Sequence, residues 1–341
     1  YDTAVSGYFA HTAKTSGGVG PSEQFALRLT LEYDKVSPLR YGENPHQSAS
    51  IYEDKSYTAP TLLQAQILAG KELSYNNYGD LDACLDMLLE FSEQFACVLK
   101  HANPCGAASG STIAEAYQAA YESDPLSAYG SIIGLNKEVD LPCAELLHET
   151  PFVECILAPK FSDDALALLS KKKTRRLLAL PQIETGRVRG LRLYKFIQGG
   201  LLVQGVDDAV TTESQLQVVT KRAPTPDEIR SLLFAWKVVK HTKSNAIVLA
   251  KGTATVGIGM GQTSRVDSAF MAVKRAGERV KGAVMASDAF FPMTDGLLTG
   301  TDAGVTAVIQ PGGSKGDPEV IAAADAAGIA MVFTGIRHFK H

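Results

Sequence analysis

Short apolar runs alternate with longer amphipathic stretches along this 341-residue sequence. The apolar runs are rich in β-branched residues and are bounded by Gly, Pro or charged residues, which is typical of buried strands. In the stretches between them apolar residues recur at helical spacing, and Thr225 followed by Pro226 marks a helix start. This alternation predicts an α/β fold. The predicted strands are 96–99, 132–135, 246–250, 283–286, 305–309 and 329–332, and the predicted helices are 80–91, 114–122, 226–237, 265–276 and 318–327.

A short internal repeat indicates two related units in tandem. The tetrapeptide VLKH at 98–101 recurs as VVKH at 238–241, and each copy is followed downstream by a Ser-Asp pair. The polar stretch 181–192 is the best boundary between the units. We therefore predict one subdomain over 1–190 and a second over 191–341. Matches this short also arise by chance, so on this observation alone repeat and coincidence both stay open.

Composition excludes several classes of protein. The 33 basic and 37 acidic residues give a net charge of −4, which offers no electrostatic reason to expect nucleic acid. The basic run 171–176 is interpreted as a solvated helix end. No apolar stretch approaches the roughly 18 residues of a membrane span, and no signal-peptide pattern is present. The 5 cysteines are odd in number and form no CxxC, so we predict free thiols and a cytoplasmic location.

Two motifs resemble known sites but lack essential residues. The segment HANPCGAA at 101–108 has the spacing of a zinc deaminase, yet Asn103 stands at the position of the proton-shuttling Glu and Ala108 at that of the second Cys ligand. One nitrogen and one sulfur ligand do not make a catalytic zinc site, so we predict no zinc. The segment GIGMGQ at 257–262 has Gln262 where a dinucleotide-binding fingerprint needs its third Gly.

Other segments concentrate side chains suited to catalysis or binding. Lys100 and His101 follow a predicted strand, where an imidazole base and an ammonium acid suit proton transfer; the alternative is a surface pair. In the segment 241–245, Asn245 suits an oxyanion, and hydroxyl and carbonyl oxygens suit a hard monovalent cation; the alternative is capping at the start of a strand. The loop 39–47 groups Arg, Tyr, Asn and His as an anion site or a polar loop.

Two further segments complete the candidates. The adjacent Phe290 and Phe291 follow a predicted strand and offer a flat slot for a planar ring, unless both lie in the core. The aromatic ending 336–341 predicts a C-terminus that is packed against the protein.

Taken together, the motifs closely resemble the transformylase part of one family, the bifunctional AICAR transformylase/IMP cyclohydrolases. They occur in family order over essentially the whole chain. The matching segments are LRYGENPHQ (39–47), KELSYNNYGDLDA (71–83), LKHANPCG (99–106), SDPLSAYG (123–130), VECILAP (153–159), KHTKSNA (240–246), GIGMGQTSRVDS (257–268), SDAFFPMTDG (287–296), QPGGSKGD (310–317) and IRHFKH (336–341). The resemblance implies two tandem cytidine-deaminase-like α/β subdomains without zinc.

The resemblance also implies a reaction. 10-Formyltetrahydrofolate would give its formyl group to the weakly nucleophilic 5-amino group of AICAR, a step of purine biosynthesis. By similarity, His101 is the base at that amine, Lys100 assists proton delivery to N10 of the leaving folate, and Asn245 stabilises the formyl oxygen.

The family pattern also assigns binding residues. For AICAR it points to Arg40, Tyr41, Asp82, Gly130, Glu154 and Arg337, of which Asp82 and Glu154 stand where some members carry another amide or acid. For folate it points to Arg265, Phe290, Asp295, Ser314 and Lys315, and for a K⁺ ion to Val239, Thr242, Ser244, Ala246 and Asp288. The family's working unit is a homodimer whose sites use both chains.

One departure from the family is large. Members usually carry an N-terminal cyclohydrolase domain, which nothing here resembles, whereas 1–5 resembles the start of the second domain. We therefore expect no IMP cyclohydrolase activity from this chain. Two other functions stay as alternatives: a binding or assembly protein that has lost catalysis, which the retained Lys100, His101 and Asn245 oppose, and a nucleobase deaminase, which the missing zinc ligands oppose.

Overall fold

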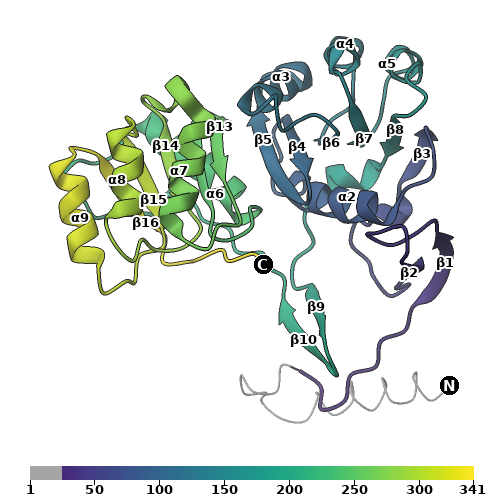
Figure 1. Cartoon of the computed structure of the whole chain (residues 1–341), viewed down its shortest axis with the longest axis horizontal. Helices are drawn as coiled ribbons and strands as arrows, with labels where there is room; N and C mark the ends of the chain where they lie inside the picture. The colour runs from purple at the N-terminus through teal and green to yellow at the C-terminus, as the bar shows by residue number, and fades with distance from the viewer. Residues whose placement is uncertain (1–24) are drawn as a thin grey trace.

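The computed structural model describes residues 25–341, so the segment 1–5 and the start of the predicted first subdomain lie outside the described residues. A 12-stranded mixed sheet runs through the molecule in the order β11-β16-β15-β14-β12-β13-β5-β4-β6-β7-β8-β3. Two hairpins stand apart from this sheet, β1–β2 and β9–β10 (Figure 1). Their strands are β1 (Asp34–Leu39), β2 (Ala49–Glu53), β9 (Arg192–Ile197) and β10 (Gly200–Gly205). Helices alternate with the strands of this sheet along the chain, which confirms the α/β fold.

The two halves of the sheet have the same topology. In the first half β4 pairs antiparallel with β5 and β6, while β6, β7 and β8 run parallel and β3 closes the edge antiparallel. In the second half β12, β13, β14, β15, β16 and β11 repeat this arrangement. The halves meet where Ala108 of β5 pairs with Ala254 of β13.

The element bounds follow the same repeated order. The first half contains β3 (Gln66–Ala69), α2 (Tyr75–Leu88), β4 (Phe95–Lys100), β5 (Asn103–Ser109), α3 (Ile113–Ser123), β6 (Ser131–Leu135), α4 (Leu141–Glu149), β7 (Val153–Ala158), α5 (Asp163–Leu169) and β8 (Arg176–Ala179). The second half contains β11 (Gln217–Val218), α6 (Pro226–Lys240), β12 (Ile247–Lys251), β13 (Ala254–Gly259), α7 (Arg265–Ala276), β14 (Val284–Ser287), α8 (Asp295–Asp302), β15 (Ala307–Gln310), α9 (Asp317–Ala326) and β16 (Ala330–Phe333). The predicted boundary 181–192 follows β8 and ends on the first residue of β9.

The tetrapeptide match that suggested a repeat is not part of it. VLKH ends β4, whereas VVKH ends α6, and the counterpart of β4 in the second half is β12. A real correspondence lies in the glycines that let a helix approach the sheet. A Cβ at Gly106 would lie 1.9 Å from the Ala120 carbonyl oxygen, and one at Gly257 would lie 2.2 Å from that of Ala272. The two tetrapeptides are therefore not equivalent positions and match by coincidence, although the topology does repeat.

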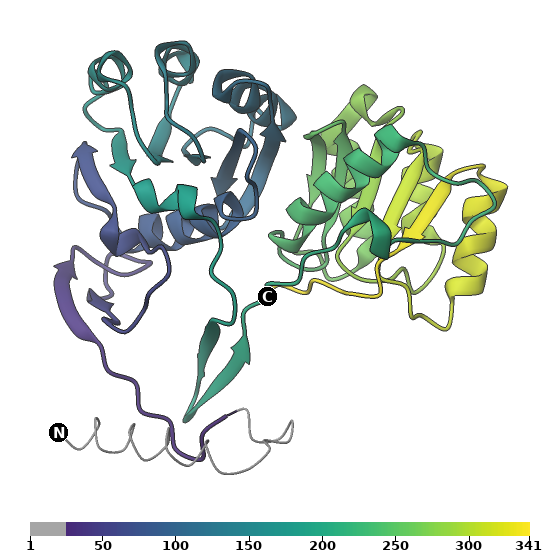
Figure 2. The ribbon, with the colours of Figure 1, turned by 180° about the vertical axis from the view of Figure 1, so that it is seen from behind.

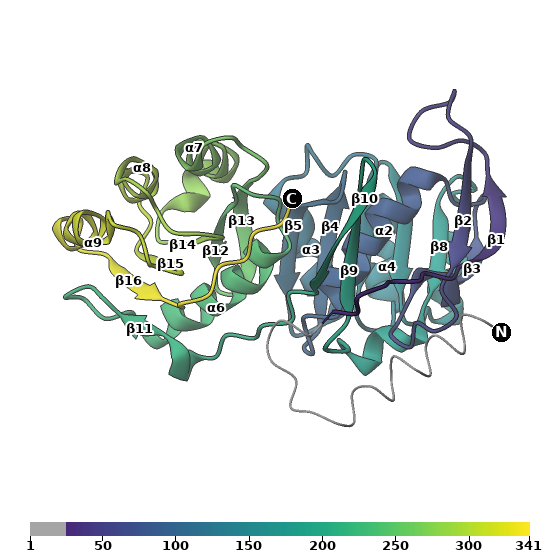
Figure 3. The ribbon, with the colours of Figure 1, turned by 90° about the horizontal axis from the view of Figure 1, so that it is seen from below.

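Helices cover both faces of the sheet. One face carries α2 and α6, which share a single apolar core across the two halves. The other face carries α3, α4 and α5 in the first half (Figure 1) and α7, α8 and α9 in the second (Figure 3), with a core for each half. Strands covered on both faces read as continuous apolar runs, which explains why β12 and β14 were predictable. None of the helices in residues 25–341 is long and apolar enough to span a membrane.

Two expectations about side chains have different outcomes. The basic run 171–176 is not simply a solvated helix end, because Arg175 is buried and its Nη2 donates to the Leu147 carbonyl at 2.9 Å, at the carboxyl end of α4. Nearby, Lys172 Nζ donates to the Thr150 carbonyl at 3.1 Å. The cysteines are free and buried, as predicted, and burial raises the pKa of Cys105 to about 12.

Candidate functional site

The turn between β4 and β5 holds two residues in a backbone conformation that they disfavour. Lys100 pairs with Asn103, so the loop is His101 and Ala102, with φ of +52° and +57°. Two-residue hairpins with positive φ at both positions normally use Gly or Asn. The equivalent turn in the second half uses Gly252, with φ of +55°. Such strain persists only where the surroundings impose it, and it is concentrated at functional sites.

The surroundings of this turn hold it and leave its side chains accessible. Asp80 Oδ1, on α2, accepts a hydrogen bond from the Ala102 N–H at 2.7 Å. Lys100 Nζ donates to the Tyr129 carbonyl at 2.7 Å, and because an ammonium has three donors, two remain for a ligand. His101 is exposed beside a cavity of about 220 Å³ between the halves, whose far wall includes Met260.

The Asn245 side chain is held at both ends. Its Oδ1 accepts from Arg265 Nη2 at 2.7 Å, and its Nδ2 donates to the Gln262 carbonyl at 2.9 Å. The partners fix the orientation of the amide, because a guanidinium only donates and a carbonyl only accepts. One Nδ2 hydrogen therefore stays available as a preorganised donor.

The buried ion pair between Arg265 and Asp288 supports the loop that carries Asn245. Asp288 is fully buried and accepts from Arg265 Nη1, from Ser244 Oγ and from the Ala246 N–H at 3.2 Å. Arg265 is also buried and donates to Ser287 Oγ at 2.8 Å. A buried carboxylate is tolerated when it is paired and its lone pairs are satisfied. Arg265, predicted to bind folate, is thus engaged in holding Asn245.

One contact joins the two halves of the site. The Lys243 N–H donates to Asn103 Oδ1 at 3.1 Å, and the Lys243 carbonyl accepts from the Gly261 N–H at 2.7 Å. Asn103 belongs to the His101 turn, and Lys243 lies two residues before Asn245. The predicted catalytic residues from both halves therefore lie at one edge of the sheet.

The remaining predicted folate residues lie on loops at this same edge, at the carboxyl ends of β14 and β15. Phe290 is 36% exposed, whereas Phe291 is fully buried, so one ring is available and the other belongs to the core. Asp295 begins α8, while Ser314 and Lys315 precede α9. A Cβ at Gly316 would lie 2.8 Å from the Pro292 carbonyl oxygen, which shows how closely the two loops approach.

The predicted AICAR residues are more scattered. Arg40 Nη2 donates to the Tyr41 hydroxyl at 2.8 Å, in the loop between β1 and β2 at the outer end of the first half, away from the junction (Figure 1 and Figure 3). Glu154, on β7, pairs with Arg176 at 2.7 Å. Within one chain, Arg40 and Tyr41 are not brought to the His101 turn.

The other three predicted AICAR residues lie closer to the edge of the sheet that carries His101 and Asn245. Gly130, with φ of +74°, precedes β6 and follows the carbonyl that holds Lys100. Asp82 lies on α2 and part of its side chain is exposed to solvent. Desolvation by the surrounding protein and the nearby Asp86 carboxylate raise the pKa of Asp82. Arg337 is exposed near the C-terminus, with its guanidinium 4.6 Å from the Phe339 ring centroid.

Sequence reasoning missed a network of charged side chains between α2 and α6. Lys240 Nζ and His241 Nε2 lie 3.2 and 3.3 Å from Glu90, and Arg187 Nε lies 3.3 Å from the same carboxylate. Burial opposes ionisation of Glu90, but the His241 hydrogen bond and the charges of Lys240 and Arg187 outweigh it and lower its pKa to about 2. The signal was present in the second Lys-His pair, which was interpreted as part of a repeat and of the segment before a strand, but not as part of a charge network.

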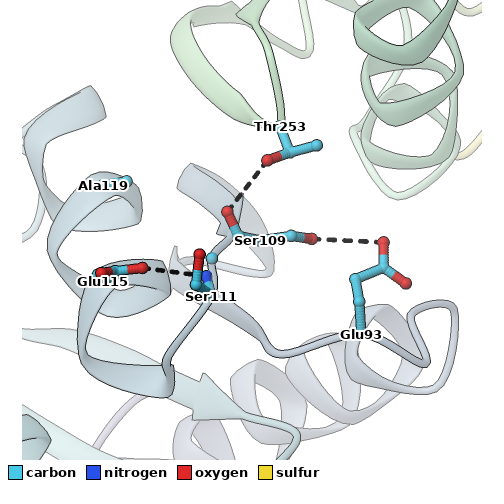
Figure 4. Close-up of a pocket in the computed structure, with 7 residues that line it drawn as sticks. Glu93, Ser109, Ser111, Glu115, Ala119 and Thr253 are labelled. Carbon is cyan, nitrogen blue, oxygen red and sulfur yellow. Dashed lines mark hydrogen bonds between the residues drawn. The ribbon is translucent and has the colours of Figure 1, made fainter.

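A larger cavity of about 480 Å³ lies at the opposite edge of the sheet and lacks comparable chemistry (Figure 4). Its walls include Glu93, Ser109 and Thr253, and Thr253 Oγ1 donates to the Ser109 carbonyl at 3.1 Å. It adjoins the turn of the second half, where Gly252 takes the place of His101. Among residues 25–341, no group of three or more His, Cys, Asp or Glu could hold a metal ion.

Comparison with known proteins gives consistent matches. A family model described as the AICARFT/IMPCHase bienzyme matches residues 1–275. Proteins named bifunctional purine biosynthesis protein PurH are similar over 100% of this chain: 50% identical in Sorangium cellulosum, 48% in Anoxybacillus flavithermus and 47% in Acetivibrio thermocellus. The chain spans 65–66% of the length of these curated relatives.

Proposed function

This chain belongs to the AICARFT/IMPCHase bienzyme family, and we propose that it transfers the formyl group of 10-formyltetrahydrofolate to the 5-amino group of AICAR, giving formyl-AICAR for IMP biosynthesis. The observation that carries the proposal is the meeting of the strained Lys100–His101 turn with the pinned Asn245 amide at one sheet edge. We also propose that the two halves are cytidine-deaminase-like subdomains with no zinc.

In the proposed reaction the amine of AICAR forms a C–N bond to the formyl carbon, and the carbonyl electron pair moves onto oxygen. The His101 imidazole accepts the proton that the amine loses. The tetrahedral intermediate then expels N10 of the folate, which takes a proton from the Lys100 ammonium. General acid–base catalysis of this kind contributes roughly 10²–10⁴-fold to a rate.

Asn245 would stabilise the negative oxygen. Its free Nδ2 hydrogen points from an amide that Arg265 and the Gln262 carbonyl already hold, so little reorganisation is needed when charge develops. A single donor of this type is worth roughly 10²–10³-fold. We therefore assign Arg265 to orienting Asn245 as well as to the folate side of the site.

Substrate contacts are proposed from the remaining residues. The exposed Phe290 ring offers a face for the planar pterin, next to the polar residues Asp295, Ser314 and Lys315. The guanidinium groups of Arg40 and Arg337 suit the phosphate of AICAR. Tyr41, Asp82, Gly130 and Glu154 would complete that subsite.

The residues expected to hold K⁺ fit a hard monovalent cation. They offer hydroxyl, carbonyl and carboxylate oxygens, and Thr242, Ala246 and Asp288 are fully buried. Val239 and Ser244 complete the set. A bound ion would supply positive charge that orders the segment leading to Asn245.

A second copy of the chain is the proposed partner. The loop between β1 and β2, which carries Arg40 and Tyr41, lies at the outer end of the first half away from β4 and β5, so these two residues would serve the His101 turn of a second copy (Figure 1). The β9–β10 hairpin projects from the body and exposes apolar side chains, with Phe196 75% and Leu202 54% exposed (Figure 2). Exposed apolar surface of this kind marks an interaction site. No membrane or nucleic-acid partner is proposed, and the cytoplasmic location stays a prediction.

The test is an assay of tetrahydrofolate formation from AICAR and 10-formyltetrahydrofolate. We expect turnover by the purified chain, and loss of turnover in His101→Ala with AICAR binding largely retained. No turnover by a folded dimer would contradict the proposal and favour the non-catalytic alternative, and an active His101→Ala would remove His101 from the mechanism. Stoichiometric zinc would favour a deaminase. The absence of cyclohydrolase activity stays a prediction, tested by adding formyl-AICAR and measuring IMP.

A further inference from the structure

The C-terminal segment, residues 336–341, lies against the loop that carries Asn245. After β16 the chain runs back along the start of β12 to the junction of the two halves (Figure 1 and Figure 3). There the Lys340 carbonyl accepts from the Ser244 N–H at 2.9 Å, and the Lys340 N–H donates to Ser244 Oγ at 3.3 Å. Ser244 directly precedes Asn245, so this segment flanks the proposed oxyanion donor.

His338 anchors the segment to the second half. It is 2% exposed, and its Nδ1 lies 2.6 Å from Asp207 Oδ2. Its ring centroid lies 4.9 Å from that of Trp236 on α6, and its N–H donates to the Asp288 carbonyl at 2.9 Å. The path of the C-terminal segment is therefore fixed before it reaches Lys340.

Lys340 then crosses to the first half. Its Nζ lies 3.0 Å from Asp86 Oδ2 on α2. Asp86 also lies 2.6 Å from Arg187 Nη2 and 3.1 Å from His241 Nδ1. Burial opposes ionisation of Asp86, but the contact with His241 and the positive charges of Lys340 and Arg187 outweigh it and hold the pKa of Asp86 well below its usual range. Asp86 is thus a charged anchor for Lys340 at all pH values where the protein would work.

We propose that Lys340 is a positioning residue for formyl transfer: by bridging Asp86 of the first half and Ser244 of the second, it holds the Asn245 amide against the His101 turn. The inference rests on the proposed function. The Asn103–Lys243 hydrogen bond ties one end of the 243–245 loop to the first half, and Lys340 ties the other. Lys340 and Asp86 are 33% and 35% exposed, and Asp86 keeps Arg187 and His241 as partners when the Lys340 ammonium is removed. A catalytic effect without a matching loss of stability therefore distinguishes this role from a structural one.

The experiment compares Lys340→Met and Lys340→Arg with Lys281→Met, an exposed ion-pair lysine far from the site. We expect Lys340→Met to lower kcat about tenfold to a hundredfold, as small displacements of catalytic groups do, with little change in KM for AICAR or in melting temperature. Lys340→Arg should recover most of kcat, Lys281→Met should match the unmodified chain, and Lys340→Met should add little to the loss caused by Asp86→Asn.

A second readout does not depend on activity. Hydrogen exchange in the peptide covering 242–246 should be faster in Lys340→Met than in the unmodified chain, without substrates present. Absence of turnover in the unmodified chain would contradict the proposed function, while this exchange result would still decide the positioning role. Unchanged exchange, an unchanged kcat, or a fall in kcat that only follows loss of folded protein would overturn the inference.

Discussion

At the scale of single residues, the site contains residues whose backbone conformation or buried environment is energetically unfavourable for their type. Ala102 has φ of +57°, where a Cβ costs roughly 1–2 kcal/mol. We expect Ala102→Gly to raise the free energy of unfolding by about 1 kcal/mol, since the gain exceeds the entropy that a glycine adds to the unfolded chain. Urea denaturation of both chains measures this change in the free energy of unfolding.

The matched control is Gly252→Ala in the equivalent turn, which imposes the same strain at φ of +55° and should lower stability. If Ala102→Gly is neutral or destabilising while Gly252→Ala destabilises, the turn of the first half is not strained as described.

The candidate catalytic residues could be chosen from the sequence, but the side chains that hold them could not. Lys100, His101 and Asn245 stand in motifs that resemble a family, and the structure brings them to one edge. Arg265 was expected at the folate, yet its guanidinium is bonded to Asn245 and Asp288. No local pattern predicts such a contact, because it forms only once α7 has packed beside β12 and β14.

At the scale of elements, the ends of α2 and α6 are joined by buried charges. Glu90 has a pKa of about 2 in the folded protein, against an ordinary value of 4.5. A lowered carboxyl pKa stabilises the protein fully above the ordinary value, and this stabilisation is lost as pH falls from about 4.5 to about 2. We expect the unmodified chain to lose more stability than Glu90→Gln between about pH 5 and about pH 2.5, by about 2 kcal/mol, because part of the stabilisation remains until the pH falls below the folded-state pKa.

Urea denaturation at both pH values measures this difference. Glu278→Gln is the control, because Glu278 pairs with Lys281 on the surface and its removal should leave the pH dependence nearly unchanged. Parallel pH profiles for Glu90→Gln and the unmodified chain would contradict the role assigned to the network.

Most elements with strong apolar patterns were predicted, although the apolar strands β7 and β8 were missed. Helix α6 follows its capping signals closely, from Pro226 onward. Strands β5 and β13 were missed because Gly and Ala have weak strand propensity. Those small residues are needed there, since α3 and α7 approach the sheet too closely for a larger side chain at Gly106 or Gly257.

At the scale of the whole molecule, the topology is repeated but the chemistry is not. Within residues 25–341, the candidate catalytic side chains lie at one edge of the sheet. The first half contributes the turn after β4 and the second the loop before β12, and the Asn103–Lys243 hydrogen bond brings the turn that carries His101 beside the loop that carries Asn245. The opposite edge has the equivalent turn without the histidine (Figure 4). An α/β fold was predictable from alternation, but the pairing of β5 with β13 that creates the edge depends on long-range contacts.

The most direct test of this account mixes two inactive variants, His101→Ala and Arg40→Ala. If Arg40 of one copy serves the His101 turn of the other, each mixed dimer has one intact site, and random exchange of subunits in a two-fold dimer should restore about a quarter of the unmodified activity. The measurement is tetrahydrofolate formation before and after subunit exchange. Restoration to that level is the predicted result, and continued inactivity of dimers shown to have exchanged would contradict a site built from two copies.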